Sequence, residues 1–279
     1  MSNNRKILMM EGNPLSVQTR AASLGVRTAS QVYTDAVRMF DNELELDILN
    51  VADGEILPSG KEFDDYAGLI ITGSSLRAFE QTPEVLNQIN FLIQFARSGK
   101  PVLGSCWGLQ IAAMAAGGKV GPSPNGRELG IARKIVKTVS GQHHPFLKGK
   151  SDVFDAPCIH YDEVIELPNC ATLLASNKHS YVQAAIIPVE KSEVWAVQYH
   201  PEFDLCDLSM LFKLYGKDML QQGFVQNEQE HVSLLSAYEC LQSNRNNKAI
   251  AWQLGIDQDI LDNSIRAAEI ANWLKHALV

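Results

Sequence analysis

One apolar run constrains the fold of this chain more than any other feature. Residues 68–72 read Gly-Leu-Ile-Ile-Thr and are closed by Gly73. A strand without a polar face is typical of a parallel sheet that helices cover on both sides. The run 101–104 has the same character, and helical patterns lie around these strands at 29–40, 83–97 and 107–116. With further strands predicted at 6–10 and 44–51, the alternation predicts the α/β class with a mostly parallel central sheet.

The second half of the chain has a different pattern. Short extended runs follow one another without long helices between them, at 130–139, 152–164, 172–175, 181–187 and 194–199. These runs predict antiparallel additions to the sheet. After about residue 205 the pattern is helical, with helices expected at 208–220, 228–241 and from a cap at 262–264 to about 277. We therefore expect two parts, residues 1–215 and a helical C-terminal extension of residues 216–279.

Charge and cysteine content exclude several functions. The 279 residues carry 24 Lys and Arg against 32 Asp and Glu, a net charge of −8. This balance argues against nucleic-acid binding, which needs clustered basic residues. No apolar run approaches the roughly 20 residues that span a bilayer. The five cysteines show neither a disulfide framework nor metal-ligand spacing. We expect a cytoplasmic protein with no membrane or nucleic-acid partner and no metal.

The first chemical motif is a cysteine between two glycines at a strand-to-helix junction. Residues 104–108 read Gly-Ser-Cys-Trp-Gly and follow the apolar strand 101–104. In this cysteine counterpart of a nucleophile elbow, small residues on either side let strand and helix pack closely. Cys106 would lie at a helix N-terminus, where the thiolate is favoured. The N–H of Trp107 would point beside the sulfur, as an oxyanion donor.

The second motif is His200-Pro201-Glu202, at the end of the extended run 194–199. The proline fixes the backbone, so that the two flanking side chains project from a rigid corner. Glu202 can then accept the Nδ1 proton of His200 and leave Nε2 free as a general base and acid. The two motifs together predict a nucleophile, a base and an orienting carboxylate at strand ends of one sheet.

These residues resemble the class I, or triad, glutamine amidotransferases, most of all the glutaminase domain of GMP synthase and its free-standing relatives. The resemblance rests on 104–110 and His-Pro-Glu at 200–202, and on matches between them at 117–118, 126–130, 160–164, 167–168 and 174–176. It covers roughly residues 6–215. It implies a flavodoxin-like α/β fold and hydrolysis of the glutamine side-chain amide through a γ-glutamyl thioester.

The resemblance also implies roles for individual residues. Cys106 matches the nucleophile, His200 the general base and acid, and Glu202 the residue that orients it. Gly73 matches the position whose N–H completes the oxyanion hole with that of Trp107. The substrate pocket is expected to include Ser74, Gln110, His160, Tyr161 and Asp162.

Two features depart from GMP synthase. The expected Gly-Gly-Pro of the oxyanion loop is replaced by Gly73-Ser74-Ser75, which predicts a more mobile loop. The phosphate loop of the synthetase domain is absent, and no P-loop or Gly-x-Gly-x-x-Gly motif follows a strand. We therefore predict no cofactor.

Three functions stay open from the sequence. The leading hypothesis is a glutaminase that releases ammonia, with a separate synthetase as its partner. The second is a free-standing hydrolase of γ-glutamyl amines or peptides, and the third is a non-catalytic binding or regulatory module on the same scaffold. A small-molecule substrate, glutamine or another γ-glutamyl compound, is expected in the first two. The sequence leaves open whether the chain forms a homo-oligomer.

Overall fold

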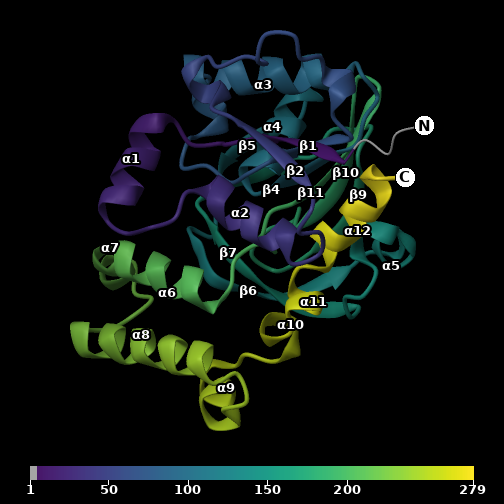
Figure 1. Ribbon diagram of the computed structural model, residues 1–279. Coiled ribbons are helices and arrows are strands. Elements are labelled where there is room, and N and C mark those ends of the chain that lie inside the picture. Colours follow the sequence, from purple (N-terminus) through teal and green to yellow (C-terminus); the bar gives the residue numbers. More distant parts are fainter. Residues whose placement is uncertain (1–4) are drawn as a thin grey trace.

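The computed structural model describes residues 5–279, and within them a nine-stranded mixed sheet lies at the centre of the fold (Figure 1). The strand order is β2-β1-β3-β4-β11-β10-β9-β6-β7. The first five strands are parallel: β2 (Glu45–Leu49), β1 (Lys6–Met10), β3 (Gly68–Ile71), β4 (Val102–Ser105) and β11 (Ser192–Val197). The others are antiparallel: β10 (Ala184–Val189), β9 (Thr172–Ser176), β6 (Glu128–Lys137) and β7 (Val153–His160). The α/β class and the antiparallel additions are confirmed.

Helices cover both faces of the parallel strands. Side chains alternate along β1, so that Leu8 and Met10 pack in one core while Ile7 and Met9 pack in the other. Helices α3 (Pro83–Ala96) and α4 (Trp107–Ala115) close the first core. Helices α2 (Ala29–Arg38) and α12 (Ala268–Ala277) close the second. This double cover explains why the central strands carry no polar face.

The antiparallel half carries smaller elements. Strands β5 (Lys119–Pro122) and β8 (Asp162–Glu166) form a separate two-stranded sheet, and α5 (Val139–His143) packs on β9. Single turns of 3-10 helix occur at Val51–Asp53, Phe63–Asp65, Ala78–Glu80 and Pro145–Leu147.

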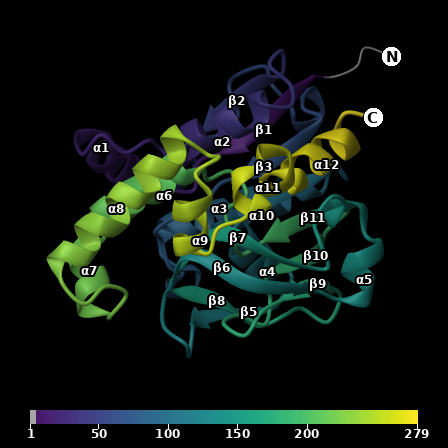
Figure 2. The same cartoon turned by 90° about the horizontal axis from the view of Figure 1, so that it is seen from below.

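A third core lies under the C-terminal helices. It joins Ile131 of β6 to side chains of α6 (Leu205–Leu214), α7 (Gly216–Gln221), α8 (Glu228–Ser243) and α9 (Lys248–Leu254). In the view from below, α8 runs alongside α6, away from the central strands (Figure 2). The short helices α10 (Gln258–Leu261) and α11 (Asn263–Arg266) then lead back to the sheet (Figure 1).

Several predicted boundaries were wrong. The helix predicted at 208–220 is divided at Tyr215 into α6 and α7. The next residue, Gly216, packs so closely on His231 that a Cβ there would be 2.6 Å from its ring. The extended run 152–164 is two strands, β7 and β8, which separate at Tyr161. The final helix is also divided, at Ala267, into α11 and α12. Helix α1 (Leu15–Ser23) and strand β5 were not predicted, and α1 buries none of its residues.

Helix α12 is part of the central fold. Trp273 is fully buried, and a Cβ on Gly68 of β3 would lie 2.8 Å from its ring, so that only glycine fits there. The boundary predicted between residues 215 and 216 stays a prediction. Within the predicted C-terminal extension, α8 and α9 belong to the third core, while α12 belongs to the second. No helix within residues 5–279 is long and apolar enough to span a membrane.

Candidate active site

Cys106 occupies a strained turn between β4 and α4. Its backbone has φ 50° and ψ −93°, the positive φ that non-glycine residues rarely adopt. Its N–H donates to Val197 O at 2.7 Å, which ties the turn to the end of β11. A Cβ on Gly104 would lie 2.8 Å from the backbone of Gly108, and a Cβ on Gly108 would lie 3.0 Å from Ile71 O, so glycine at both positions permits the close packing. The predicted elbow is thus present in the backbone.

His200 and Glu202 meet as the sequence predicted. His200 Nδ1 lies 2.7 Å from Glu202 Oε1, and the same oxygen accepts a hydrogen bond from Ser105 Oγ at 3.1 Å. The imidazole stacks on Phe203 with ring centroids 4.1 Å apart, and its backbone N–H donates to Pro157 O. Exposure is only 5% for Cys106, 3% for His200 and 4% for Glu202, so the three groups interact in a nearly dry environment.

The electrostatics favour an imidazolium. Burial lowers the pKa of His200, but the charge and hydrogen bond of Glu202 and the neighbouring Cys106 thiol outweigh burial and raise this pKa to about 10. His200 Nε2 makes no hydrogen bond of good geometry to any described nitrogen or oxygen, and so stays available on the side of the thiol. A cationic imidazole stabilises a neighbouring thiolate, which is the nucleophilic form of cysteine.

Gly73 lies against the imidazole. A Cβ at this position would be 2.7 Å from His200 Cε1, shorter than any normal contact. The carbonyl of Gly73 accepts from Thr72 Oγ1 at 3.1 Å, while Asn13 Oδ1 accepts from Ser75 N at 2.9 Å. These bonds hold the loop that follows β3, although it lacks proline. The predicted oxyanion position is therefore adjacent to the base.

We expect Gly73→Ala to lower kcat by roughly 100-fold, because its methyl group would displace the imidazole and a shift of about 1 Å costs that much. Steady-state kinetics on a γ-glutamyl compound, the substrate class that the sequence resemblance implies, and the thermal midpoint would measure the effect. Ser75→Ala in the same loop adds no atom and should stay near wild type. Equal kinetics for Gly73→Ala and wild type would place the catalytic imidazole elsewhere.

The residues predicted to bind substrate form a partly connected group. Gln110 Nε2 donates to Asp162 O at 2.9 Å, and His160 Nδ1 lies 3.2 Å from the same oxygen. The Asp162 carboxylate faces Arg77, with both nitrogen–oxygen distances at 3.3 Å. Ser74 Oγ accepts from Leu76 N at 3.1 Å and so belongs to the oxyanion loop.

Tyr161 differs from its neighbours. Its side chain is 40% exposed, and its ring lies 3.8 Å from the Arg127 guanidinium. Its hydroxyl bonds to Gln222 at the end of α7. Tyr161 thus links the segment 160–162 to the C-terminal helices. No contact between Tyr161 and the triad is found in the described part of the chain.

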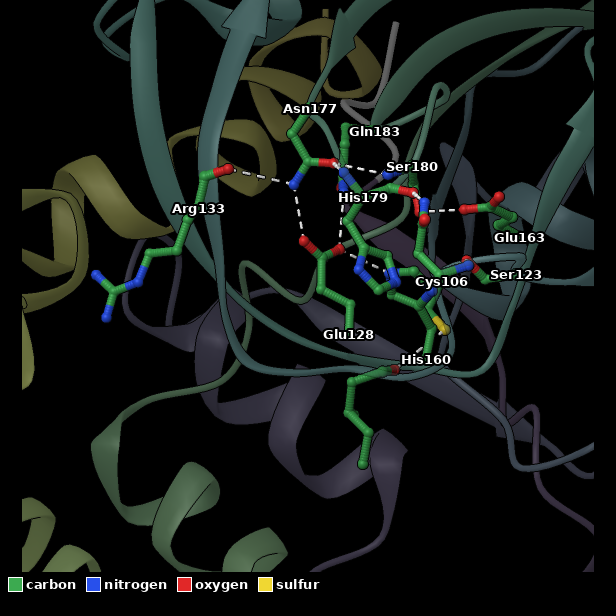
Figure 3. A network of polar contacts seen from close by, with 12 residues as sticks. Cys106, Ser123, Glu128, Arg133, His160, Glu163, Asn177, His179, Ser180 and Gln183 are labelled. Atoms are coloured by element: carbon green, nitrogen blue, oxygen red, sulfur yellow. Dashed lines mark hydrogen bonds and ion pairs between the residues drawn. The ribbon is translucent and has the colours of Figure 1, made fainter. Parts of the chain in front are cut away.

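A buried polar network adjoins the thiol (Figure 3). Ile159 O lies 3.7 Å from Cys106 Sγ, and the next residue, His160, places Nε2 2.8 Å from Glu128 Oε2. Asn177 and Gln183 donate to the same carboxylate at 2.7 and 2.8 Å. Burial raises the pKa of Glu128, but the hydrogen bond and charge of His160 and the two amide bonds outweigh it, so the net pKa is lowered.

Sequence reasoning missed the residues that hold this site in place. Asn13 fixes the loop after β3, Ser105 supports Glu202, and Glu128 fixes His160. Asn13 stands in an ordinary turn cluster, and Ser105 has no signal except its place beside Cys106. Glu128 lies in the segment 126–130 that carried the family resemblance, which was the one available signal. Within residues 5–279, no group of three or more His, Cys, Asp or Glu side chains is arranged to hold a metal.

Comparison with known protein families gives a direct result. The sequence pattern described as glutamine amidotransferase class-I matches residues 30–225, which is more than half of the chain. This chain belongs to the class I glutamine amidotransferase family. A solved glutamine amidotransferase from Thermotoga maritima shares the fold with a TM-score of 0.68, covering 98% of this chain and 97% of that one, at 17% identity.

Relatives of known activity fall into two groups. Gamma-glutamyl-L-1-hydroxyisopropylamide hydrolase of Pseudomonas sp is 29% identical over 98% of this chain and 93% of that protein. Gamma-glutamyl peptidase 4 of Arabidopsis thaliana is 34% identical, over 59% of this chain and 64% of the peptidase. The glutamine-hydrolyzing GMP synthase subunit of Methanoregula boonei is 30% identical, over 57% of this chain and 77% of its own length. The γ-glutamyl amide hydrolase thus matches almost the whole chain, including its C-terminal helices.

Proposed function

We propose that this protein is a free-standing hydrolase of γ-glutamyl amide bonds, acting on γ-glutamyl amines or peptides. The observation that carries the proposal is the 98% coverage of this chain by the Pseudomonas γ-glutamyl amide hydrolase, against 57% by its GMP synthase relative. A protein that only supplies ammonia to a synthetase has no evident need of the additional helices. The cysteine, imidazole and carboxylate at the strand ends support a thiol-dependent mechanism.

In the proposed mechanism, the sulfur of Cys106 attacks the amide carbon as a thiolate that is paired with the His200 imidazolium. The tetrahedral oxyanion accepts hydrogen bonds from the N–H groups of Trp107 and Gly73. The C–N bond breaks as His200 protonates the leaving amine, which yields a γ-glutamyl thioester. Water then gives a proton to His200 and attacks the thioester, so that glutamate leaves and the thiolate is restored. Glu202 keeps the imidazole in the required orientation throughout.

A substrate panel tests this proposal. The purified protein is incubated with glutamine, γ-glutamyl alkylamides and γ-glutamyl dipeptides, and release of glutamate is measured for each. We expect substituted amides to be hydrolysed with higher kcat/KM than glutamine, and Cys106→Ala to abolish all turnover. Turnover retained in that variant would exclude the thiol mechanism.

The same panel separates the two other hypotheses. Hydrolysis of glutamine alone, at a rate that rises in the presence of a synthetase, would support ammonia transfer to a partner. Failure of a glutamine-like electrophile to label Cys106, together with no turnover on any substrate, would support a non-catalytic module.

A further inference from the structure

A cationic groove lies beside the candidate active site and has no role in the proposed chemistry. It has a volume of about 660 Å³, and Arg127, Arg133, Lys134 and Lys178 are among its lining residues. Glu128 is the single carboxylate in the lining, so the local balance is four positive charges against one negative. The protein as a whole has a net charge of −8, and the groove is therefore of opposite sign to the molecule.

Arg127 has donors that no protein group satisfies. Its side chain is 5% exposed, and its guanidinium lies between the rings of Tyr161 and Tyr215, at 3.8 and 4.5 Å. Nε and Nη1 have no hydrogen-bond partner in the described structure, and Nη1 is 3.5 Å from a carboxylate oxygen of Asp218. A buried guanidinium with unfilled donors is costly unless an anion completes its bonding.

The other cations of the groove differ in availability. Arg133 is already occupied, since it donates to Asp155 at 2.9 Å and to backbone carbonyls near the end of α9. Lys178 is exposed at the end of β9, next to Asn177. Lys134 is exposed as well. Arg127 directly precedes Glu128, and Lys178 follows Asn177, which bonds to Glu128, so these two are the charges next to that carboxylate.

The position of the groove relative to the thiol follows from His160. One edge of its ring faces Asp162 O through Nδ1, and the other faces Glu128 through Nε2. Glu128 lines the groove, and Ile159 O next to His160 contacts Cys106 Sγ at 3.7 Å. In Figure 3 the Glu128 and His160 side chains lie between the backbone of Arg133 and Cys106.

The two sides of His160 are suited to different parts of the substrate. The flank of Gln110 and Asp162 is the one predicted to hold the amino-acid end of the substrate. The groove lies on the opposite edge of His160, and so on the flank that the leaving amine would occupy. The Glu128 carboxylate is already hydrogen-bonded to His160, Asn177 and Gln183. The cations farther along the groove are therefore the groups that could bind a negatively charged ligand.

We propose that Arg127 and Lys178 form an anion subsite that binds a carboxylate on the leaving amine, so that the protein prefers γ-glutamyl peptides to uncharged γ-glutamyl amides. This inference rests on the proposed function and narrows its substrate class. The ligand is recognised by charge-assisted hydrogen bonds to a carboxylate, for which the planar guanidinium is suited.

Two matched substrates test the subsite. γ-Glutamylglycine and γ-glutamylglycinamide differ in one terminal charge, and their kcat/KM ratio isolates recognition of the carboxylate. We expect wild type to favour γ-glutamylglycine by roughly 10-fold or more, and Lys178→Glu and Arg127→Met each to reduce that ratio by a similar factor. Lys191→Glu is the matched control, because this exposed lysine directly precedes β11, at the end of the strand opposite to His200.

The outcomes are separable from the failure of the proposed function. A ratio near one in wild type, or an unchanged ratio in both variants, overturns the subsite while hydrolysis itself stands. If wild type hydrolyses neither compound, binding of both to Cys106→Ala is measured by calorimetry. Tighter binding of γ-glutamylglycine that is lost in Cys106→Ala/Lys178→Glu supports the subsite, and equal or no binding overturns it.

Discussion

Replacing Glu202 by glutamine is expected to lower kcat by roughly 10³–10⁴ while the fold is retained. The carboxylate holds Nδ1 of His200 at 2.7 Å and stabilises the imidazolium, whereas an amide can also present its NH₂ group and favour the wrong tautomer. Glutamate and glutamine have the same shape, so the decrease in kcat measures the contribution of the carboxylate charge and of its hydrogen-bond acceptor. Rapid-quench or steady-state kinetics on the best substrate of the panel would measure it.

The pH profile gives this prediction a second readout. Glu202 contributes most to the raised pKa of His200, so Glu202→Gln should lower that pKa towards the value that burial alone dictates. If the thiolate–imidazolium pair is the reactive form, the alkaline decline of kcat/KM in wild type follows His200 near pH 10 and moves to lower pH in the variant.

The same shift predicts how stability depends on pH. The folded-state pKa of His200 is raised to about 10, above the ordinary value of 6.5. The contribution of the charged imidazole to stability is therefore complete below about pH 6.5 and is lost as the pH rises towards 10.

For the Glu202→Gln kinetics, Ser105→Ala is the matched control, because it removes the second hydrogen bond to Glu202 and keeps the carboxylate. Unchanged kcat and an unmoved profile in Glu202→Gln would contradict the assigned role.

Replacing Lys150 by methionine is expected to destabilise the fold by about 3–5 kcal/mol, because it leaves a buried carboxylate without its counter-charge. Lys150 and Glu269 both have fully buried side chains, with Nζ and Oε1 3.5 Å apart. Lys150 Nζ also donates to Arg266 O, while Tyr199 OH donates to Glu269 at 2.5 Å. Burial raises the pKa of Glu269, and the charge of Lys150 opposes this rise.

The double variant Lys150→Met/Glu269→Gln separates charge pairing from packing. It removes both ions, so we expect it to recover a large part of the lost stability relative to Lys150→Met alone. Urea denaturation followed by intrinsic fluorescence provides the comparison. The single variant Glu269→Gln completes the comparison. If the losses in the free energy of unfolding in the two single variants add up to the loss in the double variant, the two groups do not interact.

Local sequence patterns were sufficient for the parallel half of the fold. The strands at 6–10 and 68–72 and the helix at 83–97 were predicted within one or two residues, because burial on both faces leaves an unmistakable apolar run. The breaks at Tyr215 and Ala267 were not predicted, and the packing of Gly216 against His231 next to the first break joins segments that a local pattern does not connect. The burial of Trp273 under β3 has no local signal for the same reason.

The candidate site was predictable where a motif enforces local geometry. The glycines around Cys106 and the proline between His200 and Glu202 have steric consequences that can be read directly from the sequence. The pairing of Arg127 with Tyr161 and Tyr215 could not be anticipated, because it joins three segments that are far apart in the sequence. The proposed anion subsite depends on long-range contacts of this kind, whereas the motif residues can be read from the sequence alone.

The crowding of backbone around Cys106 also limits how the protein can be redesigned. A Cβ on Gly12 would lie 2.6 Å from Gly73 O, and the corresponding shortest distances are 2.7 Å at Gly73, 2.8 Å at Gly104 and 3.0 Å at Gly108. Libraries that aim at new substrates should keep these four positions constant and diversify the groove side chains, such as Lys178, instead. Natural divergence within this scaffold is expected to be confined in the same way, with invariant turns at the nucleophile and variable side chains around the leaving amine.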